Sequence, residues 1–140
     1  MSDKLLRPIP LEELWDKWAR YGVGLLECIR NTKAHYKPED VYVDLRSGRS
    51  HLYEIGDFGF VIFQQHQDPD GLVLFVYALW CKAGEYQKRL AAVYEELEEF
   101  ARSMKAKRIR MQGRDGWSKH RFFTETARVY EHEVGNGQSA

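Results

Sequence analysis

Two cysteines are the first side chains whose type suggests chemistry, because a thiolate can attack an electrophile or bind a metal. Cys28 and Cys81 lie far apart, and the chain has no other cysteine. Two such residues cannot form a disulfide framework or a zinc site, so we expect reduced, buried thiols. The sequence places no histidine beside Cys81 as a base, whether His51, His66, His120 or His132. Cys81 is therefore interpreted as a buried cysteine at a strand end.

The turn Gly113-Arg114-Asp115-Gly116-Trp117 is a second candidate site. It has three interpretations. It is a tight turn whose Trp117 packs on the sheet, the rim of a cofactor or substrate pocket, or a contact site for another protein. The third interpretation is considered because Trp and Arg, here Trp117 and Arg114, anchor many interfaces. His120, just beyond the turn, is either a pocket residue or a surface histidine.

Charged residues exclude one class of function. Lys and Arg together number 21, as do Asp and Glu, so the formal net charge is zero. A non-specific nucleic-acid binder needs a basic surplus to neutralise phosphates. The net charge does not exclude a local basic patch, for which residues 105–110 are a candidate. The acidic run Glu95, Glu96, Glu98 and Glu99 is interpreted as a solvated helix face and not as a carboxylate site.

Length and composition fit one soluble domain. The chain has 140 residues, of which 44% are hydrophobic, enough for a core. The N-terminus has no apolar segment typical of a signal peptide, and no apolar run approaches the roughly 20 residues of a membrane span. These features predict an intracellular protein without a membrane segment. We expect a single domain over 1–134 and a frayed tail over 135–140.

The elements that must position these residues follow from hydrophobic spacing. A short edge strand over 5–7 precedes Pro8 and Pro10. Helical spacing then predicts either one long helix or two helices joined near 21–24, with Trp15 and Trp18 in the core. Pro38 starts a second helix that ends near Gly48. Four-and-three spacing predicts a long amphipathic helix over 85–105.

Strands account for most of the remaining chain. Alternating or continuous apolar residues predict strands over 51–55, 58–65, 72–81 and 108–112. The middle two are apolar on both faces and are expected to pair antiparallel, joined by a hairpin loop over 67–71. A short helix over 118–124 and a last strand over 127–134 complete the chain.

The order strand-helix-helix-strand-strand-strand-helix-strand-helix-strand resembles the GNAT superfamily of N-acetyltransferases. The resemblance implies an α/β (α+β) fold with a mixed, mainly antiparallel sheet and helices on both faces. In that fold the strand before the long helix splays from its neighbour. Acetyl-CoA pairs with the backbone of that strand, and its pyrophosphate sits on amides at the helix N-terminus. The implied cofactor-binding residues are Leu79, Trp80, Cys81, Lys82, Gly84, Gln87 and Lys88.

The chain is also similar to small GNAT-like proteins encoded by tailed bacteriophages. The resemblance covers nearly the whole chain and rests on Tyr36 to Asp40, on the strand ending in Trp80, and on the Gly113 to Trp117 turn. It implies a virion or host-cytoplasm location. The implied partners are other phage virion proteins or a host protein.

The phosphate turn departs from the family pattern. GNAT proteins use an R/Q-x-x-G-x-G/A turn whose free amides hold the pyrophosphate. The segment from Cys81 to Arg89 has one glycine, Gly84, and Glu85 adds negative charge near the helix start. This negative charge is offset in part by the positive side chains of Lys82, Lys88 and Arg89.

The catalytic candidates are Glu54 as base and Tyr77 as acid. Tyr77 lies in the expected splayed strand, and we expect Glu54 on an adjacent strand. The family's acid is a Tyr in the helix after the fifth strand, where this chain has Phe122 and Phe123. Tyr77 has the alternative interpretation of a core tyrosine.

Two functions follow. One is a phage GNAT-like protein that has lost acetyl-CoA and acts as a virion, assembly or accessory binding protein. The alternative is an active N-acetyltransferase that uses acetyl-CoA on an unknown amine.

Overall fold

A computed structural model describes residues 4–32, 37–82, 84–111 and 132. Its elements, in chain order, are β1 (Leu6–Pro8), the 3-10 turn η1 (Leu11–Glu13), α1 (Leu14–Thr32), α2 (Pro38–Ser47), β2 (His51–Ile55), β3 (Gly59–Asp68), β4 (Gly71–Cys81), α3 (Glu85–Ser103) and β5 (Arg108–Met111). The order up to β5 agrees with the expected one. The helix over 118–124, the strand over 127–134 and the tail over 135–140 lie outside the described residues, except for residue 132.

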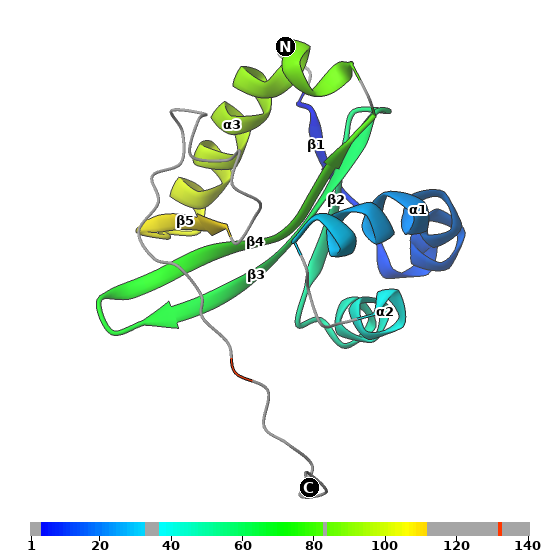
Figure 1. Ribbon diagram of the computed structural model, residues 1–140. Coiled ribbons are helices and arrows are strands. Elements are labelled where there is room, and N and C mark those ends of the chain that lie inside the picture. The colour runs from blue at the N-terminus through cyan, green and yellow to red at the C-terminus, as the bar shows by residue number, and fades with distance from the viewer. Residues whose placement is uncertain (1–3, 33–36, 83, 112–131, 133–140) are drawn as a thin grey trace, which may run out of the picture.

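The strands form one sheet in the order β1-β2-β3-β4-β5. All neighbours pair antiparallel except β4 and β5, which are parallel and are connected through α3. Figure 1 shows α3 on one side of the sheet and α1 with α2 on the other. This arrangement is the mixed, mainly antiparallel sheet with helices on both faces that the sequence predicts.

The alternation of side chains along the strands creates two cores, one on each face. The α3-side cluster consists of Leu6, Ile55, Phe58, Val61, Phe63, Leu74, Val76, Leu79, Val93, Tyr94, Leu97 and Ala101. The α1/α2-side cluster consists of Leu14, Tyr21, Leu25, Val41, Leu45, Leu52, Phe60, Ile62 and Ala78. Strand β3 contributes buried residues to both clusters, so it is the centre of the molecule.

Helix α1 is one continuous helix and includes both Gly22 and Gly24. Gly24 is needed because the Trp80 ring lies against it: a Cβ there would sit 2.6 Å from Trp80 Cδ2. Nothing lies within 4 Å of a Cβ at Gly22. Close packing of α1 on β4 therefore depends on the absence of a side chain at Gly24.

Several sequence expectations are corrected in detail. Trp15 is not in the core, because 71% of its surface is exposed. Glu96 is not simply solvated, since its carboxylate accepts hydrogen bonds from the backbone amides of Leu5 and Leu6 at 2.7 and 3.1 Å. The loop between β3 and β4 is shorter than 67–71, because pairing continues to Asp68 and Gly71.

Candidate functional site

Strand β4 contains a β-bulge at Tyr77. Ile62 of β3 pairs with Ala78, and the next residue, Phe63, pairs with Val76. Two neighbouring residues of β3 therefore span three of β4, and Tyr77 is the additional one. A bulge bends its strand and increases the local twist. The second half of β4 consequently runs in a different direction from the first half.

The described pairing of β4 with β5 reaches the bulge, and the chain directly after Met111 lies outside the described residues. The four parallel pairs run from Val73–Arg108 to Val76–Met111. In the described part of the chain, residues 78–81 of β4 pair with β3, and Tyr77 is the bulged residue. We call residues 77–81 the open edge of β4.

The open edge leads directly to the N-terminus of α3. Gly84 is the N-cap residue, with φ 86°, and no side chain caps the helix there. A Cβ at Gly84 would meet nothing within 4 Å. The first amides of a helix have no partner within the helix and attract anions. The turn before α3 thus leaves amides available at one end of the open edge.

Cationic side chains lie at the same end of the sheet. Lys82 is exposed, and its amide donates to Phe58 O at 2.7 Å. The Arg89 guanidinium lies 5.6 Å from the centroid of the Phe58 ring. Lys82 and Arg89 line a hollow of about 350 Å³ together with Leu5, Gly56, Asp57 and Phe58. Positive charge is therefore available near the α3 N-terminus.

Tyr77 is half-buried and packs against the α1/α2-side cluster. Burial raises the pKa of its hydroxyl, and the carboxylates of Asp44 and Asp40 on α2 add to this increase. At neutral pH the hydroxyl keeps its proton. A protonated phenol at the bulge can donate a hydrogen bond or a proton.

Glu54 lies in a different environment from the one expected. Strand β3 separates β2 from β4, so the expectation that Glu54 is on a strand adjacent to that of Tyr77 is wrong. Glu54 is buried, with 6% of its surface exposed. One carboxylate oxygen accepts a hydrogen bond from the Tyr21 hydroxyl, and the other lies 3.4 Å from Lys17 Nζ.

The pKa of Glu54 reflects opposing effects. Burial alone would raise it, but the hydrogen bond from Tyr21 and the charges of Lys17 and Arg7 outweigh burial. The net pKa is lowered, so the carboxylate is ionised at neutral pH. Arg20 adds a further positive charge, with NH1 3.9 Å from the carboxylate. Glu54 therefore connects α1 to the sheet.

Trp80 and Leu79 connect the open edge to α1. Trp80 stacks on Phe60 with ring centroids 5.8 Å apart, and its Nε1 donates to Glu27 Oε2 at 2.7 Å. The Cys28 thiol donates to Leu79 O at 3.5 Å. Sequence reasoning missed Glu27. No local signal identifies it, because its partner is far away in the chain and Glu27 looks like an ordinary solvated helix residue.

The remaining predicted site residues are placed only in part. Cys81 and Cys28 form no disulfide and are half-buried, so the expectation of buried thiols is met only in part. Gln87 and Lys88 lie in the first turns of α3, and the structure describes their backbone only. Arg114, Trp117 and His120 lie outside the described residues. Among the described residues, no cluster of His, Cys, Asp and Glu is arranged to hold a metal ion.

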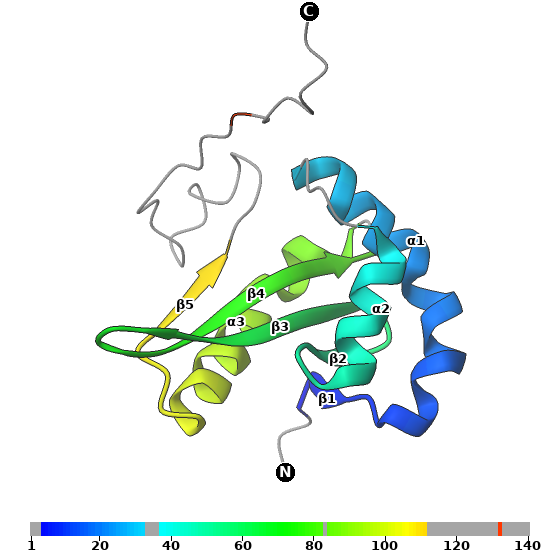
Figure 2. The same ribbon diagram turned by 90° about the horizontal axis from the view of Figure 1, so that it is seen from below.

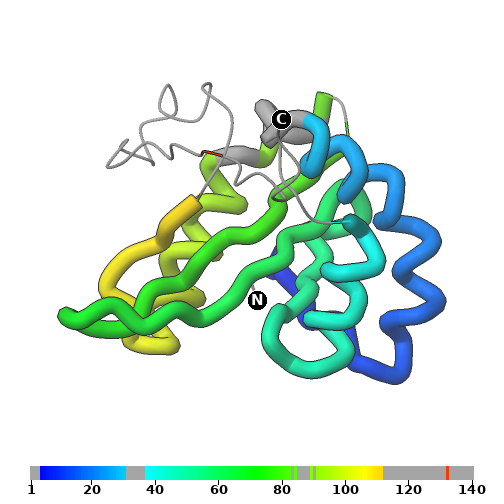
Figure 3. Tube along the Cα trace, turned by 60° about the horizontal axis from the view of Figure 1, so that its bottom comes forward, coloured from blue at the N-terminus to red at the C-terminus, as the bar shows by residue number. Residues whose placement is uncertain are grey.

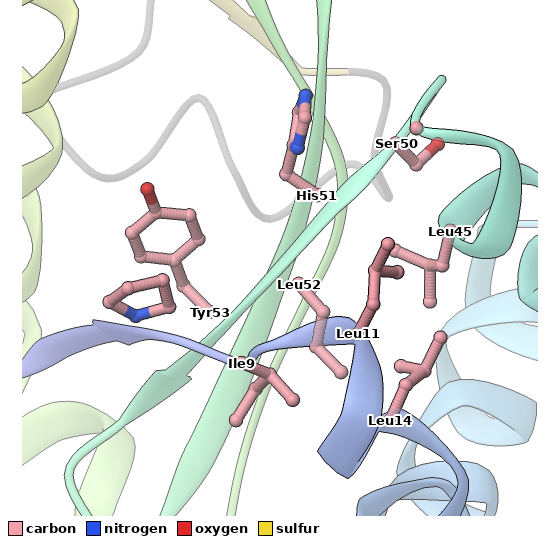
Figure 4. A pocket seen from close by; sticks show the side chains of 10 residues that line it. Ile9, Leu11, Leu14, Leu45, Ser50, His51, Leu52 and Tyr53 are labelled. Carbon is pink, nitrogen blue, oxygen red and sulfur yellow. The ribbon is translucent and has the colours of Figure 1, made fainter.

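A second hollow, of about 220 Å³, lies between β1, β2, η1 and α2 (Figure 4). Apolar side chains dominate it, including Ile9, Leu11, Leu14 and Leu52. Ser50, at its edge, already receives a hydrogen bond from Gln64 Nε2 at 2.8 Å. His51 and Tyr53 of β2 also line this hollow, and two strands separate β1 from β4, so it lies away from the open edge.

Several solved structures with a similar fold are acetyltransferases. A ribosomal-protein-alanine N-acetyltransferase from Brucella melitensis aligns over 94% of this chain and 98% of its own, with a TM-score of 0.63 and 14% identity. A protein from Clostridium acetobutylicum, described as a predicted acetyltransferase with acetyl-CoA, aligns over 91% and 94%, with a TM-score of 0.64 and 9% identity. An acetyltransferase from Trypanosoma brucei aligns over 92% and 98%, with a TM-score of 0.60 and 13% identity.

These similarities confirm the expected fold class: the chain has the GNAT-like fold of these acetyltransferases. Sequence comparison adds nothing further. No protein-family model matches the chain, and no curated protein matches it significantly. In the described part of the chain, no helix is both long and apolar enough to cross a membrane. At identities this low the fold alone is shared, so function must be argued from the site.

Proposed function

We propose that this protein binds a coenzyme A thioester along the open edge of β4 and transfers the acyl group to an amine. The observation that carries the proposal is the bulge at Tyr77, which bends the second half of β4 just before the start of α3. A bulge at that point redirects the backbone of a central strand, as binding of an extended ligand requires. One structure with this fold is that of a predicted acetyltransferase with acetyl-CoA.

The residues present fit such a cofactor. The backbone of Leu79, Trp80 and Cys81 would hold the extended pantetheine arm. The uncapped amides after Gly84 and the charge of Lys82 would hold the diphosphate. Gln87 and Lys88, in the first turns of α3, would add further contacts. When bound, coenzyme A supplies an acyl group activated as a thioester.

The proposed proton donor is Tyr77. Its raised pKa keeps the hydroxyl protonated at neutral pH, as is required of a group that protonates a departing thiolate. The bulge places this residue at the start of the open edge. Tyr77 belongs to the chain segment that would also contact the cofactor, so the donor and the thioester are positioned together.

The base has two candidates. Glu54 is ionised, but its carboxylate is already bound by Tyr21, Lys17 and Arg20. Strand β3 also separates it from β4. Glu27 is hydrogen-bonded to Trp80 of the open edge, and its side chain is exposed. We assign Glu54 the role of holding α1 on the sheet. We assign Glu27 the role of accepting a proton from the amine.

Calorimetry with acetyl-CoA tests the cofactor. We expect micromolar binding to the wild type and no binding to Gly84→Asp, which adds a carboxylate at the helix N-terminus. Gly48→Asp is a matched control, because Gly48 has nearly the same φ, 84°, and equally open surroundings at the end of α2. Absence of binding to the wild type at millimolar acetyl-CoA contradicts the proposal.

A second function is favoured by one feature of the phosphate turn. The segment from Cys81 to Lys88 contains a single glycine, and Glu85 is the first residue of α3. A carboxylate there opposes a diphosphate. In this alternative the protein is a phage virion or assembly component, or binds a host protein, and has lost the cofactor. The turn at 113–117, with Arg114, Trp117 and His120, would then be the contact site.

Mass spectrometry of purified particles tests this alternative. A virion component is expected in particles of a source phage at a fixed copy number. Absence from particles would restrict the alternative to a role in the host cytoplasm. Micromolar binding of acetyl-CoA would contradict the proposed loss of the cofactor.

A further inference from the structure

Helix α1 carries a second row of apolar residues, on the flank of the face it buries. Leu14, Tyr21 and Leu25 face the sheet and are buried. Trp15, Ala19, Gly22 and Leu26 are spaced by four, three and four residues, so they lie in line along this flank of the helix. Val23 lies beside them. We call these five residues the outer stripe of α1.

The outer stripe is exposed to an unusual degree for apolar residues. Trp15 is 71% exposed, Val23 67% and Leu26 40%. Trp15 makes an edge contact with Tyr42 of α2, with ring centroids 5.8 Å apart. Figures 2 and 3 show α1 as the outermost element on its side of the sheet.

The spacing of the outer stripe is that of a coiled-coil seam, which repeats every three and four residues. Its two central positions are the small residues Ala19 and Gly22, and a Cβ at Gly22 would meet nothing within 4 Å. Small residues let two helix backbones approach closely. The larger residues, Trp15 and Leu26, lie at the two ends. In an antiparallel pair of such helices, Trp15 lies against Leu26 of the partner subunit.

The charges along α1 favour the same antiparallel pairing. Glu12 and Asp16 are exposed at the start of the helix, and Arg30 is exposed at its end. An antiparallel pair centred between Ala19 and Gly22 places Arg30 beside the partner subunit's Glu12 and the partner subunit's Asp16. Helical side chains lean toward the helix N-terminus, so Arg30 and the partner's Asp16 lean toward each other. A parallel pair would instead place like charges together.

We propose that the outer stripe of α1 is the interface of a two-fold symmetric homodimer, in which α1 pairs antiparallel with α1 of a second copy. The interface is isologous, because the same stripe contributes from both subunits. It lies on the far side of α1 from β4, so the open edge stays accessible in the dimer. The inference does not depend on binding of coenzyme A.

The length of the stripe limits the affinity. From Trp15 to Leu26 it extends roughly 17 Å, which is a short helix–helix contact. Interfaces that bury less than about 1,000 Å² form weak or transient complexes. We therefore expect a dimer with a dissociation constant of roughly 10–100 μM, in exchange with the monomer.

Sedimentation velocity over a range of protein concentrations tests the dimer. The wild type is expected to shift from monomer to dimer, and Val23→Glu to weaken association at least about tenfold. Val43→Glu is the matched control, because this valine of α2 is 62% exposed and lies off the stripe. Its dissociation constant is expected to equal that of the wild type. A wild type that stays monomeric up to about 1 mM overturns the proposal.

Charge reversal tests the antiparallel orientation. Arg30→Glu places three acids together and is expected to abolish the dimer. The double variant Asp16→Arg/Arg30→Glu restores one attractive pair but keeps the repulsion by the partner's Glu12, so it is expected to associate at least about tenfold more tightly than Arg30→Glu without reaching the wild type. Equal loss in the single and the double variant would overturn the antiparallel pairing. Equal weakening by Val23→Glu and Val43→Glu would place the interface elsewhere and overturn the proposal itself.

Discussion

The buried carboxylate of Glu54 illustrates what individual residues contribute to this fold. Its charge is stabilised by a hydrogen bond from Tyr21 and by the ammonium group of Lys17. Both partners belong to α1, whereas Glu54 belongs to β2. Removing a partner from a buried charge is costly, because the charge keeps its desolvation penalty and loses its compensation. The group therefore connects α1 to the sheet with directional contacts.

Stability is expected to fall at acidic pH because of Glu54. Its pKa is lower in the folded protein than in the unfolded chain, so its contribution is complete above the unfolded pKa and is lost as pH falls through the folded pKa. Urea unfolding at pH 7 and pH 3.5 measures this. In Glu54→Gln the pH-dependent loss should be smaller, and stability at pH 7 lower by about 1–3 kcal/mol. An unchanged pH dependence in Glu54→Gln would contradict this account.

The two glycines of α1 give a matched pair of predictions. Gly22→Ala should stabilise the monomer by up to about 1 kcal/mol, because alanine favours the helix and its methyl group meets no neighbour. Gly24→Ala should destabilise it by about 1–3 kcal/mol, because the methyl group would overlap the Trp80 ring. Urea unfolding below the concentration of any self-association compares them. The two changes in the free energy of unfolding must have opposite signs. Equal changes would contradict the packing of Trp80 on α1.

Single residues also show where sequence reasoning reached its limit at the site. Tyr77 could be assigned to β4 from its apolar neighbours, but its position as the additional residue of a bulge depends on the register with β3. Glu27 accepts a hydrogen bond from Trp80, and Glu54 accepts one from Tyr21, only after the chain has folded. Such pairs leave no local pattern. Contacts between distant residues are therefore the part of the site that the sequence could not predict.

At the level of elements, the proposed diphosphate site depends on the N-terminus of α3. Its N-terminus has uncapped amides after Gly84, and its first residue is Glu85. The helix dipole favours an anion there, and a carboxylate at the first position competes for the same field. The proposed diphosphate site is therefore weakened by its own first residue.

Glu85→Gln is expected to tighten acetyl-CoA binding about two- to fivefold, which corresponds to the usual worth of one charge at a helix terminus. Calorimetry at low ionic strength measures the change, and added salt should reduce it. Glu95→Gln is the matched control, because Glu95 is exposed on the same helix and lies far from its start. Weaker binding in Glu85→Gln would show that the carboxylate helps to hold the ligand.

The elements themselves were largely predictable, and the errors have physical reasons. Apolar periodicity identified α1, α2 and α3 and strands β2 to β5 to within a few residues. Trp15 was wrongly assigned to the core, because it lies at the edge of the apolar stripe of α1 and not at its centre. The stripe was expected to be buried across its width, whereas Trp15 and Leu26 at its edge are exposed. Periodicity shows that a face is apolar and does not show what covers it.

At the scale of the whole molecule, one strand joins two cores. Strand β3 places Val61 and Phe63 in the α3-side cluster and Phe60 and Ile62 in the α1/α2-side cluster. Its neighbours β2 and β4 also contribute to both. Loss of packing on one face must therefore loosen the strands that support the other. This connection predicts that the two halves unfold as one cooperative unit.

Leu25→Ala and Leu97→Ala test this cooperativity, because the two leucines are fully buried on opposite faces. Each is expected to cost about 2–5 kcal/mol. In a Trp117→Phe background, the remaining tryptophans, Trp15, Trp18 and Trp80, all lie on the α1/α2 side or on α1 itself. Their fluorescence therefore reports on one side, while far-UV circular dichroism reports on the whole chain.

For Leu97→Ala, whose cavity lies on the α3 side, both signals should shift to the same lower urea midpoint. Val43→Ala, at an exposed site, should leave both midpoints within about 0.5 kcal/mol of the parent. If the fluorescence midpoint of Leu97→Ala stayed at the parent value while circular dichroism shifted, the α1/α2 side would unfold on its own. The shared strand would then not couple the cores, and α1 could detach from the sheet without loss of α3.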